Sequence, residues 1–254
     1  KGRAGKLAFS IGNVNSLPLV MSAFLVFFLT TEVGLSPWLA GLIWSFTGVW
    51  GVISNVVIGS LSDRTRTRWG RRRPFVVMGI PIVLLFNILA WSPPLGGKPL
   101  TDPYSLQIFF YTLIVVAFYR LGNVMVDLNT HALFPEIWTD QKDRSEVTIY
   151  RESLAVVGGV IAMVLFPFMI TQFGGNLGAW AWAGGIALTI FAGCSLISVL
   201  GMRERKEFSV VDKPLPLIAS FKAALTTRSW ITYIGASIMT DCMVDWLSMF
   251  VFFF

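Results

Sequence analysis

A row of polar side chains interrupts the otherwise apolar stretch from 106 to 134. Arg120, Asn123, Asp127 and His131 follow one another at spacings of three, four and four residues, which predicts one shared helical face. Such a face combines proton-exchanging groups with hydrogen-bonding partners for a polar solute. We expect a substrate- and proton-binding site here, with a structural polar seam as the alternative.

A pair of aspartates lies near the end of the sequence, in TDCMVDWLSMF. Asp241 and Asp245 are four residues apart and therefore share a helical face. Two carboxylates this close in lipid do not both stay ionised at low cost, so one of them would hold a proton. We expect a contribution to proton coupling, unless a water-filled cleft solvates both groups.

The elements that position these residues are membrane-spanning helices. Of 254 residues, 55% are hydrophobic and 13% are charged, whereas soluble domains carry about 25% charged residues. A spanning helix needs roughly 20 mostly apolar residues, and the continuous apolar runs disagree with the alternating strands of a membrane barrel. The fold class is therefore an all-α polytopic membrane protein. Seven spans are predicted, at about 8–31, 37–60, 74–93, 106–134, 153–171, 178–202 and 229–254.

The basic residues indicate the orientation of these spans. With the N-terminus in the cytoplasm, 18 of the 20 lysines and arginines fall in cytoplasmic segments or beside them, as the positive-inside rule predicts. Anionic membrane lipids beside this basic surface account for the net charge of +6 without nucleic acid. We expect a multi-pass protein of the cell (inner) membrane, with Trp91 and Trp180 in its interfacial aromatic belts.

Six arginines crowd the segment GSLSDRTRTRWGRRRPF (59–75). Topology explains their charge, but not the acidic and small residues among them. An aspartate at this helix end is placed for charge-assisted bonds, and a glycine before it allows close helix approach. Such bonds would exist only while the cytoplasmic ends are together, so we expect a conformational latch. The expected latch residues are Gly59, Asp63, Arg64, Arg71 and Arg72.

This arginine-rich segment resembles a signature of the major facilitator superfamily. Its longer form is similar to that of the glycoside–pentoside–hexuronide cation symporters and the related sucrose transporters. KLAFSIGN, TTEVGLSPWLAG and HALFPEIWTDQKDRSEVTIYRES (131–153) resemble further segments of this branch. The resemblance implies a major facilitator fold of twelve spans in two halves, with the solute cavity between the halves.

On this resemblance the chain corresponds to the N-terminal half plus one helix. We expect a six-helix transmembrane domain over 1–202, a cytoplasmic inter-domain loop over 203–228 and an incomplete C-terminal transmembrane domain over 229–254. The implied partner is the remaining C-terminal half or another membrane subunit.

The resemblance also implies roles for single residues. It places Asp127 on the family's sugar-contacting aspartate. It places Arg151 on an arginine that binds sugar hydroxyls, and a cytoplasmic anchor is an equal alternative for Arg151. Asn123 and His131 stand where the family has aromatic residues, and the sugar itself is therefore left open.

The family's cation site is altered in this sequence. The alignment places Asn15 on an aspartate of the first span, and Gly51 and Asn55 on two aspartates of the second. Sodium prefers hard, anionic oxygen ligands, so the loss of three carboxylates disfavours sodium and no metal site is predicted. Proton coupling through Asp127 is the better expectation.

The expected function is secondary transport of a sugar- or glycoside-like solute by alternating access, coupled to protons. The alternatives are a carrier of an amphipathic, lysolipid-like solute, uncoupled facilitation, and a transporter-derived membrane subunit without transport activity. One histidine and two cysteines form no catalytic or metal-ligand pattern, so neither an enzyme nor a cofactor is predicted. The expected partners are a small solute, protons and membrane lipids.

Overall fold

A computed structural model describes residues 3–12, 17–94 and 102–201 of the chain. Beyond them it describes only seven residues, all helical: Thr226, Arg228, Thr232, Gly235, Ala236, Met239 and Met243. The contacts divide the chain into two units, Lys1–Val210 and Val211–Phe254.

Five helices of the described residues are long and apolar enough to cross a membrane. They are α3 (Pro37–Arg64), α4 (Arg73–Ala90), α5 (Asp102–Ile137), α6 (Gln141–Gln172) and α7 (Leu177–Gly201). Each overlaps most of one predicted span, and the prediction of a polytopic helical protein is confirmed. The largest difference is in α6, which begins twelve residues before its predicted apolar span because its first turns are polar.

The first predicted span, 8–31, is divided in the structure. It comprises α1 (Arg3–Ile11), α2 (Leu17–Phe27) and a π-helical turn, η1 (Phe28–Glu32). Gly12 forms a turn directly after α1, where a Cβ atom would lie 2.6 Å from the Cβ of Ser198 in α7. The prediction of one continuous helix over 8–31 was therefore wrong. Helix α1 ends at Ile11, where the chain packs closely against α7.

Glycine and proline set the other boundaries as their backbone preferences predict. Pro37 and Pro74 stand in the first turns of α3 and α4, where the missing amide hydrogen costs nothing. Gly174 and Gly175 have φ angles of 89° and 66° between α6 and α7, a region that glycine adopts without strain. These two glycines therefore form the turn that separates the predicted spans 153–171 and 178–202.

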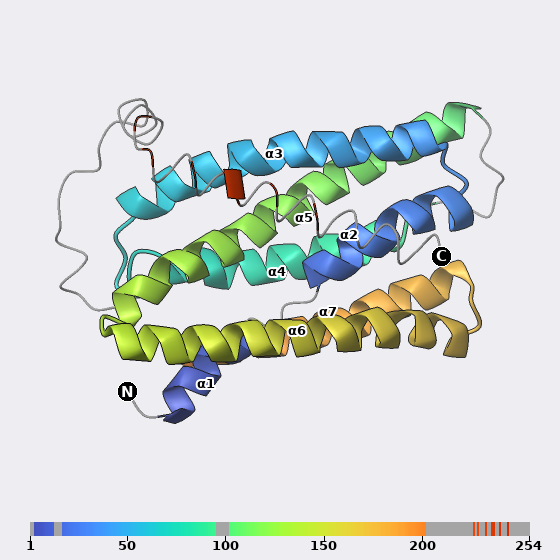
Figure 1. The fold of residues 1–254 in the computed structure, drawn as a ribbon. Helices are drawn as coiled ribbons and strands as arrows, with labels where there is room; N and C mark the ends of the chain where they lie inside the picture. Colours follow the sequence, from blue (N-terminus) through green and yellow to red (C-terminus); the bar gives the residue numbers. More distant parts are fainter. Residues whose placement is uncertain are drawn as a thin grey trace. The chain divides into compact units, whose positions relative to one another are not determined.

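Helix α5 is the central element around which α3 and α4 pack (Figure 1). Helices α4 and α5 approach each other closely because each contributes a glycine to the contact. A Cβ atom on Gly79 of α4 would lie 2.8 Å from Val126, and one on Gly122 of α5 would lie 2.9 Å from Ile82. Helices α6 and α7 pack against each other, and α1 packs against both.

Aromatic rings fill the space between η1, the end of α4, α6 and α7. Trp91 stacks on Trp180 with ring centroids 5.7 Å apart, and Phe28 and Phe166 contact both indoles. Only 1% of Trp91 and 4% of Trp180 is exposed. The expectation that these two tryptophans form interfacial belts is therefore wrong, because they join four elements in a buried cluster.

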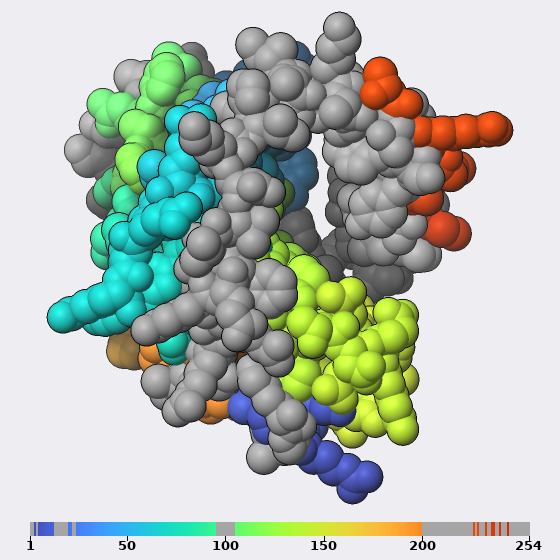
Figure 2. Space-filling view, turned by 90° about the vertical axis from the view of Figure 1, so that its left-hand side faces the viewer, coloured from blue at the N-terminus to red at the C-terminus, as the bar shows by residue number. Residues whose placement is uncertain are grey.

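The arginine-rich segment forms a compact turn between α3 and α4. Thr67 and Gly70 exchange backbone hydrogen bonds of 3.1 and 3.3 Å, and Gly70 has a φ of 114°. Figure 2 views the end of the unit at which α3 ends and α6 begins, with the turn in cyan and the first turns of α6 in yellow-green. The basic residues thus lie at one end of the helices.

Candidate solute-binding face

The polar row of α5 opens to the surface of the first unit. Arg120, Asp127 and His131 are exposed, whereas Asn123 is only 5% exposed. A spacing of three residues turns a helix by about 300°, which rotates Asn123 away from the line joining the other three. The expectation of one shared face therefore holds for three of the four residues, and Asn123 is part of the helix packing.

Asp127 and His131 form a pair on this face. The Nδ1 atom of His131 lies 3.2 Å from Oδ1 of Asp127 and 3.0 Å from the Asp127 carbonyl oxygen. Both neighbours are acceptors, so Nδ1 carries a hydrogen and donates it. Nε2 is then the nitrogen at which the ring gains or loses a proton. The two side chains are 61% and 54% exposed, so the pair is open to water wherever this face meets a crevice.

The side chain of Arg120 reaches across to α3. A Cβ atom built on the buried Gly51 would lie 2.9 Å from Nε and 3.4 Å from Nη2 of Arg120. The guanidinium group therefore packs on the α3 backbone, in space that any larger residue at 51 would fill. One turn earlier, Trp50 donates its indole hydrogen to the Ala117 carbonyl at 2.9 Å, which fixes the register of α3 against α5.

Arg151 is buried near the start of α6, with 6% of the residue exposed. Its guanidinium carbon lies 5.1 Å from the ring centre of Phe134 and 6.0 Å from that of Phe9. These cation–π distances place the charge between α1, α5 and α6. The two roles expected for Arg151, a sugar-binding residue and a cytoplasmic anchor, remain predictions.

Three of the five expected latch residues, Asp63, Arg71 and Arg72, lie in an ion-pair network at the end of three helices. Arg72 contacts Asp63 at 3.0 Å and Glu136 at 3.3 Å, while Arg71 contacts Glu136 at 2.8 Å. The network therefore connects the end of α3, the start of α4 and the end of α5. Arg64 takes part in none of the ion pairs found among the described residues, and a Cβ on Gly59 would meet Leu128 of α5 at 3.6 Å.

Three of the expected site residues lie outside the described part of the chain. These are Asn15, Asp241 and Asp245. Their expected roles in solute binding and proton coupling remain predictions.

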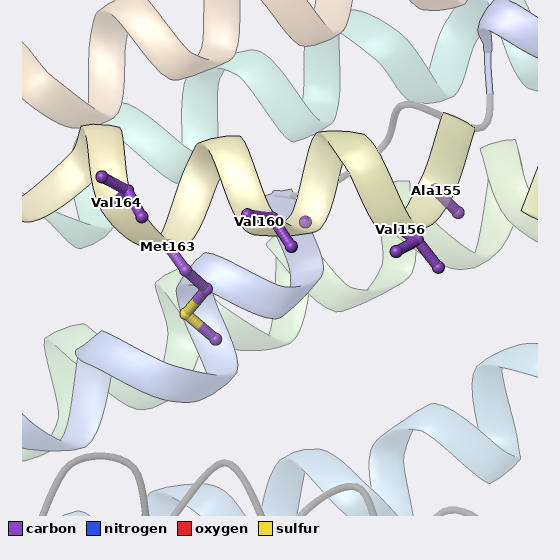
Figure 3. Close-up of a pocket in the computed structure, with 6 residues that line it drawn as sticks. Ala155, Val156, Val160, Met163 and Val164 are labelled. Carbon is purple, nitrogen blue, oxygen red and sulfur yellow. The ribbon is translucent and has the colours of Figure 1, made fainter. Parts of the chain in front are cut away.

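An apolar hollow on α6 offers a contrast to the polar face. It has a volume of about 510 Å³ and is lined by residues of successive turns of α6. Figure 3 shows carbon and one sulfur on its side chains, with Met163 extending into it. Without a polar side chain, this hollow does not orient a hydroxylated solute, so the polar row of α5 is the candidate site. The lining residues are Ala155, Val156, Gly159, Val160, Met163 and Val164.

Sequence reasoning missed two functional contacts. Glu136 follows a proline in α5 and binds two arginines of the turn, and the PEI motif was the only signal for it. The contact between Arg120 and Gly51 joins residues 69 positions apart in sequence. The sequence around Arg120 has no other charge, which indicates that its side chain contacts another helix. No periodic pattern identifies the residue that it contacts.

The family of this chain follows from comparison with known proteins. A family model described as "MFS/sugar transport protein" matches residues 9–254. The chain belongs to this family of the major facilitator superfamily, whose helical, multi-pass architecture agrees with the five spanning helices.

Its relatives include proteins that are named for different solutes. The inner membrane symporter YicJ of Escherichia coli is 27% identical over 72% of this chain and 39% of its own length. The isoprimeverose transporter of Lactiplantibacillus pentosus is 22% identical over 91% of the chain and 46% of its own length. The sodium-dependent lysophosphatidylcholine symporter 1 of Gallus gallus is 22% identical over 93% and 50%. The chain thus spans about half the length, or less, of the curated relatives it matches.

Proposed function

We propose that the protein containing this chain is a proton-coupled secondary transporter of a sugar- or glycoside-like solute. The Asp127–His131 pair carries this proposal, because it is an exposed, proton-exchanging pair on an otherwise apolar membrane helix. An ionisable residue within a spanning helix is costly in lipid, and it is retained where it faces a crevice or binds a solute. The family membership supports the transport of a small solute.

In the proposed mechanism, the Asp127–His131 pair takes up one proton and the solute together. Nδ1–H of His131 holds the carboxylate of Asp127 in place, so Nε2 or the second carboxylate oxygen receives the proton. Sugar hydroxyls then donate to the carboxylate and accept from Arg120. Alternating access would release both on the opposite side, and Asn15, Asp241 and Asp245 are proposed to complete the site.

The proposed setting is the cell (inner) membrane, with the N-terminus and the arginine-rich turn in the cytoplasm. The excess of basic residues at one end of the helices supports this orientation. We also propose that residues 1–202 act as one transmembrane domain, joined through 203–228 to a second domain beginning at 229. The second domain would supply the other wall of the solute cavity.

The test is solute-induced proton movement in proteoliposomes. A panel of glycosides is added without a preformed gradient, and the external pH is followed together with the uptake of labelled solute. The wild-type protein should take up a proton with its solute. Asp127→Asn should abolish the pH change, because an asparagine amide does not take up a proton near neutral pH. In a second assay with an imposed inward proton gradient, it should reduce solute accumulation to the equilibrium level.

The matched control is Asp140→Asn, since Asp140 is an exposed aspartate before the first turn of α6. Its removal should leave uptake and the pH change intact. Uptake that survives Asp127→Asn and an ionophore that collapses the pH gradient would contradict the proton-coupled mechanism. Stable association with a membrane complex, without any uptake, would instead favour the subunit alternative.

A second candidate is a carrier of an amphipathic solute. The lysophosphatidylcholine symporter of Gallus gallus is similar to this chain over 93% of the chain. The hollow on α6 has only apolar side chains. Uptake of labelled lysophosphatidylcholine, in the absence of uptake of any glycoside, would select this candidate.

A further inference from the structure

We propose that the contact between α4 and α5 contains an internal binding site for water, formed by the side chains of Asn87, Tyr119 and Asn123. The site is separate from the exposed polar row of α5, and it does not depend on the proposed transport function. Three observations support it: the burial of the three side chains, the level at which they meet, and their mixture of unpaired donors and acceptors.

The three side chains are buried between two membrane-spanning helices. Asn87 of α4 is 0% exposed, and Tyr119 and Asn123 of α5 are 4% and 5% exposed. Tyr119 and Asn123 are four residues apart and therefore share one face of α5. Arg120 belongs to another face, because its guanidinium group packs on Gly51 of α3.

Two contacts between the helices determine the level of Asn87. A Cβ atom on Gly122 of α5 would lie 3.0 Å from Val83 of α4. Further along α4, the Leu89 carbonyl accepts a hydrogen bond of 2.9 Å from the hydroxyl of Tyr111 in α5. The two helices are therefore antiparallel, and Asn87 lies between these two contacts.

The polar atoms that meet at this level are unpaired. The Tyr119 hydroxyl lies close enough to interact with the side chains of Asn87 and Asn123, but no hydrogen bond of acceptable geometry joins them. Within the described part of the chain, no partner is found for this hydroxyl, for Nδ2 and Oδ1 of Asn87 or for Nδ2 of Asn123. Buried polar atoms of this kind cost free energy unless a partner satisfies them.

Two other asparagines in these helices show how an amide is commonly satisfied. Nδ2 of Asn55 and Nδ2 of Asn129 each donate at 2.8 Å to the carbonyl oxygen four residues earlier in the same helix. Nδ2 of Asn87 and Nδ2 of Asn123 make no such bond to the described residues. Both amides instead lie near the Tyr119 hydroxyl, where a molecule between them would satisfy all three groups.

The mixture of unpaired atoms identifies this molecule as water. Each Nδ2 only donates, Oδ1 of Asn87 only accepts, and the hydroxyl of Tyr119 does both. A metal cation does not accept from an amide N–H, and an anion does not donate to Oδ1. Water donates and accepts, and a buried water typically makes about three hydrogen bonds. The burial of the three side chains leaves room only for a small ligand of this kind.

Hydroxyl-radical labelling by X-rays tests for this water. Radiolysis of a bound water produces a hydroxyl radical beside the side chains that hold it, so it marks residues that bulk water does not reach. The protein in lipid nanodiscs is mixed with heavy-oxygen water, exposed to an X-ray pulse after increasing delays, and analysed by mass spectrometry. Tyr119 should be oxidised, and the heavy isotope should appear on it later than bulk mixing.

Phe28 is the matched control within the same protein. It is also an aromatic residue and is 0% exposed, but it packs against the rings of Trp91 and Trp180. Its label should therefore stay at background at the dose that oxidises Tyr119.

Three variants separate a bound water from a dry contact. Asn87→Leu removes two unpaired atoms and should reduce the label on Tyr119 to the level of Phe28. Asn55→Leu, at an exposed position of α3, should leave the label on Tyr119 unchanged. Tyr119→Phe retains the ring but removes one hydrogen-bonding group, so its label should persist and the heavy isotope should appear after a shorter delay. This last variant also tests the site if Asn87→Leu does not fold.

Each result supports or overturns the site. A wild-type Tyr119 that stays at background, or a label that Asn87→Leu leaves unchanged, overturns the bound water. Incorporation of the heavy isotope as fast as bulk mixing shows direct access from solvent and overturns an internal site. A delay that Tyr119→Phe does not shorten overturns the role of the hydroxyl as a ligand of the water.

Discussion

Two aspartates beside basic side chains illustrate how position determines the role of a residue. Asp63 contacts Arg72 at the charged end of the helices, where water screens the pair and the contact mainly holds elements together. Asp127 contacts His131 within a membrane helix, where a carboxyl group and an imidazole ring are both titratable side chains. The same residue type is therefore structural at one position and a candidate transport group at the other.

At the residue scale, His131→Gln tests the division of labour within the pair. The glutamine amide still donates a hydrogen bond toward Asp127, but it does not take up a proton. We expect solute binding within about threefold of wild type, because the donor is retained, together with a weaker dependence of uptake on pH. The measurement is solute affinity and uptake rate between pH 5.5 and 8.5. An unchanged pH profile would assign the proton to Asp127 alone.

Two adjacent glycines in α7 give a second residue-scale prediction. A Cβ on Gly184 would lie 2.5 Å from Cδ1 of the buried Trp91, whereas a Cβ on Gly185 meets nothing within 4 Å. The rigid indole has no room to shift, so Gly184→Ala should cost about 1–3 kcal/mol of unfolding free energy. Gly185→Ala should be neutral or slightly stabilising, since alanine favours helix. Thermal unfolding in detergent compares the two, and equal melting temperatures would contradict the packing described.

At the scale of elements, the contact between α4 and α5 depends on small residues. Gly79 and Gly122 let the helix backbones approach, and apolar side chains from the opposite helix fill the surface around them. In lipid, where apolar surfaces gain little from leaving the solvent, such close packing is the main source of helix association. The position of the polar face of α5 therefore depends on two residues that have no side chain.

Gly122→Ala should weaken this contact by about 1–3 kcal/mol, because its Cβ would lie 3.0 Å from the Val83 backbone nitrogen, which is not free to move. The matched control is Gly48→Ala in α3, where an added Cβ meets nothing within 4 Å. Reversible unfolding in detergent compares both variants with wild type. A loss of stability as large in Gly48→Ala as in Gly122→Ala would contradict a specific role of the α4–α5 contact, because alanine favours helix more than glycine does.

A single lysine forms the ion pairs between α1 and α6. Lys6 is largely buried, donates to Asp143 at 2.7 Å and also contacts Glu146. These two carboxylates raise the pKa of Lys6 above its ordinary value. A raised pKa means that the stabilisation is fully present below the unfolded-state pKa of about 10.4. It is lost as the pH rises through the higher folded-state value.

We therefore expect amide exchange in α1, corrected for the intrinsic effect of pH, to become faster above about pH 10.5 in the wild-type protein. Lys6→Gln should show fast exchange at every pH, because its neutral amide replaces a charge-assisted contact. Hydrogen exchange followed by mass spectrometry between pH 8 and 11.5 gives the comparison. Protection of α1 that is equal in both proteins, or that does not change with pH, would contradict the role of Lys6.

The positions of most helices could be predicted from the sequence. Apolar runs located the spanning helices, and Gly174 and Gly175 marked a turn, because these signals are local. The burial of Asn123 and the Trp91–Trp180 cluster were not accessible, since they depend on which helices become neighbours. The contact between Arg120 and Gly51 could not be predicted either, because it depends on a position that has no side chain.

At the scale of the whole molecule, transport requires the helix ends to separate and rejoin. The network of Asp63, Arg71, Arg72 and Glu136 lies at one such end and holds α3, α4 and α5 together. The ion pairs that the described residues form in this network join elements of the first unit, so we propose that it keeps this unit rigid while the cavity opens and closes. A latch between the two halves would require further contacts from the second half.

Glu136→Gln tests this interpretation, because Glu136 accepts a hydrogen bond from Arg71 and forms an ion pair with Arg72. Its side chain is 17% exposed, so we expect a loss of about 1–3 kcal/mol in stability, between the values for exposed and buried ion pairs. If the network only stiffens the unit, the maximal uptake rate should fall modestly at constant solute affinity. If it is a latch between two conformations, the variant should change the ratio of inward- to outward-facing protein, measured by spin-label distances, and the apparent affinity with it. Arg66→Gln, in the same turn, should change neither quantity, because the positive charge it removes lies outside the network.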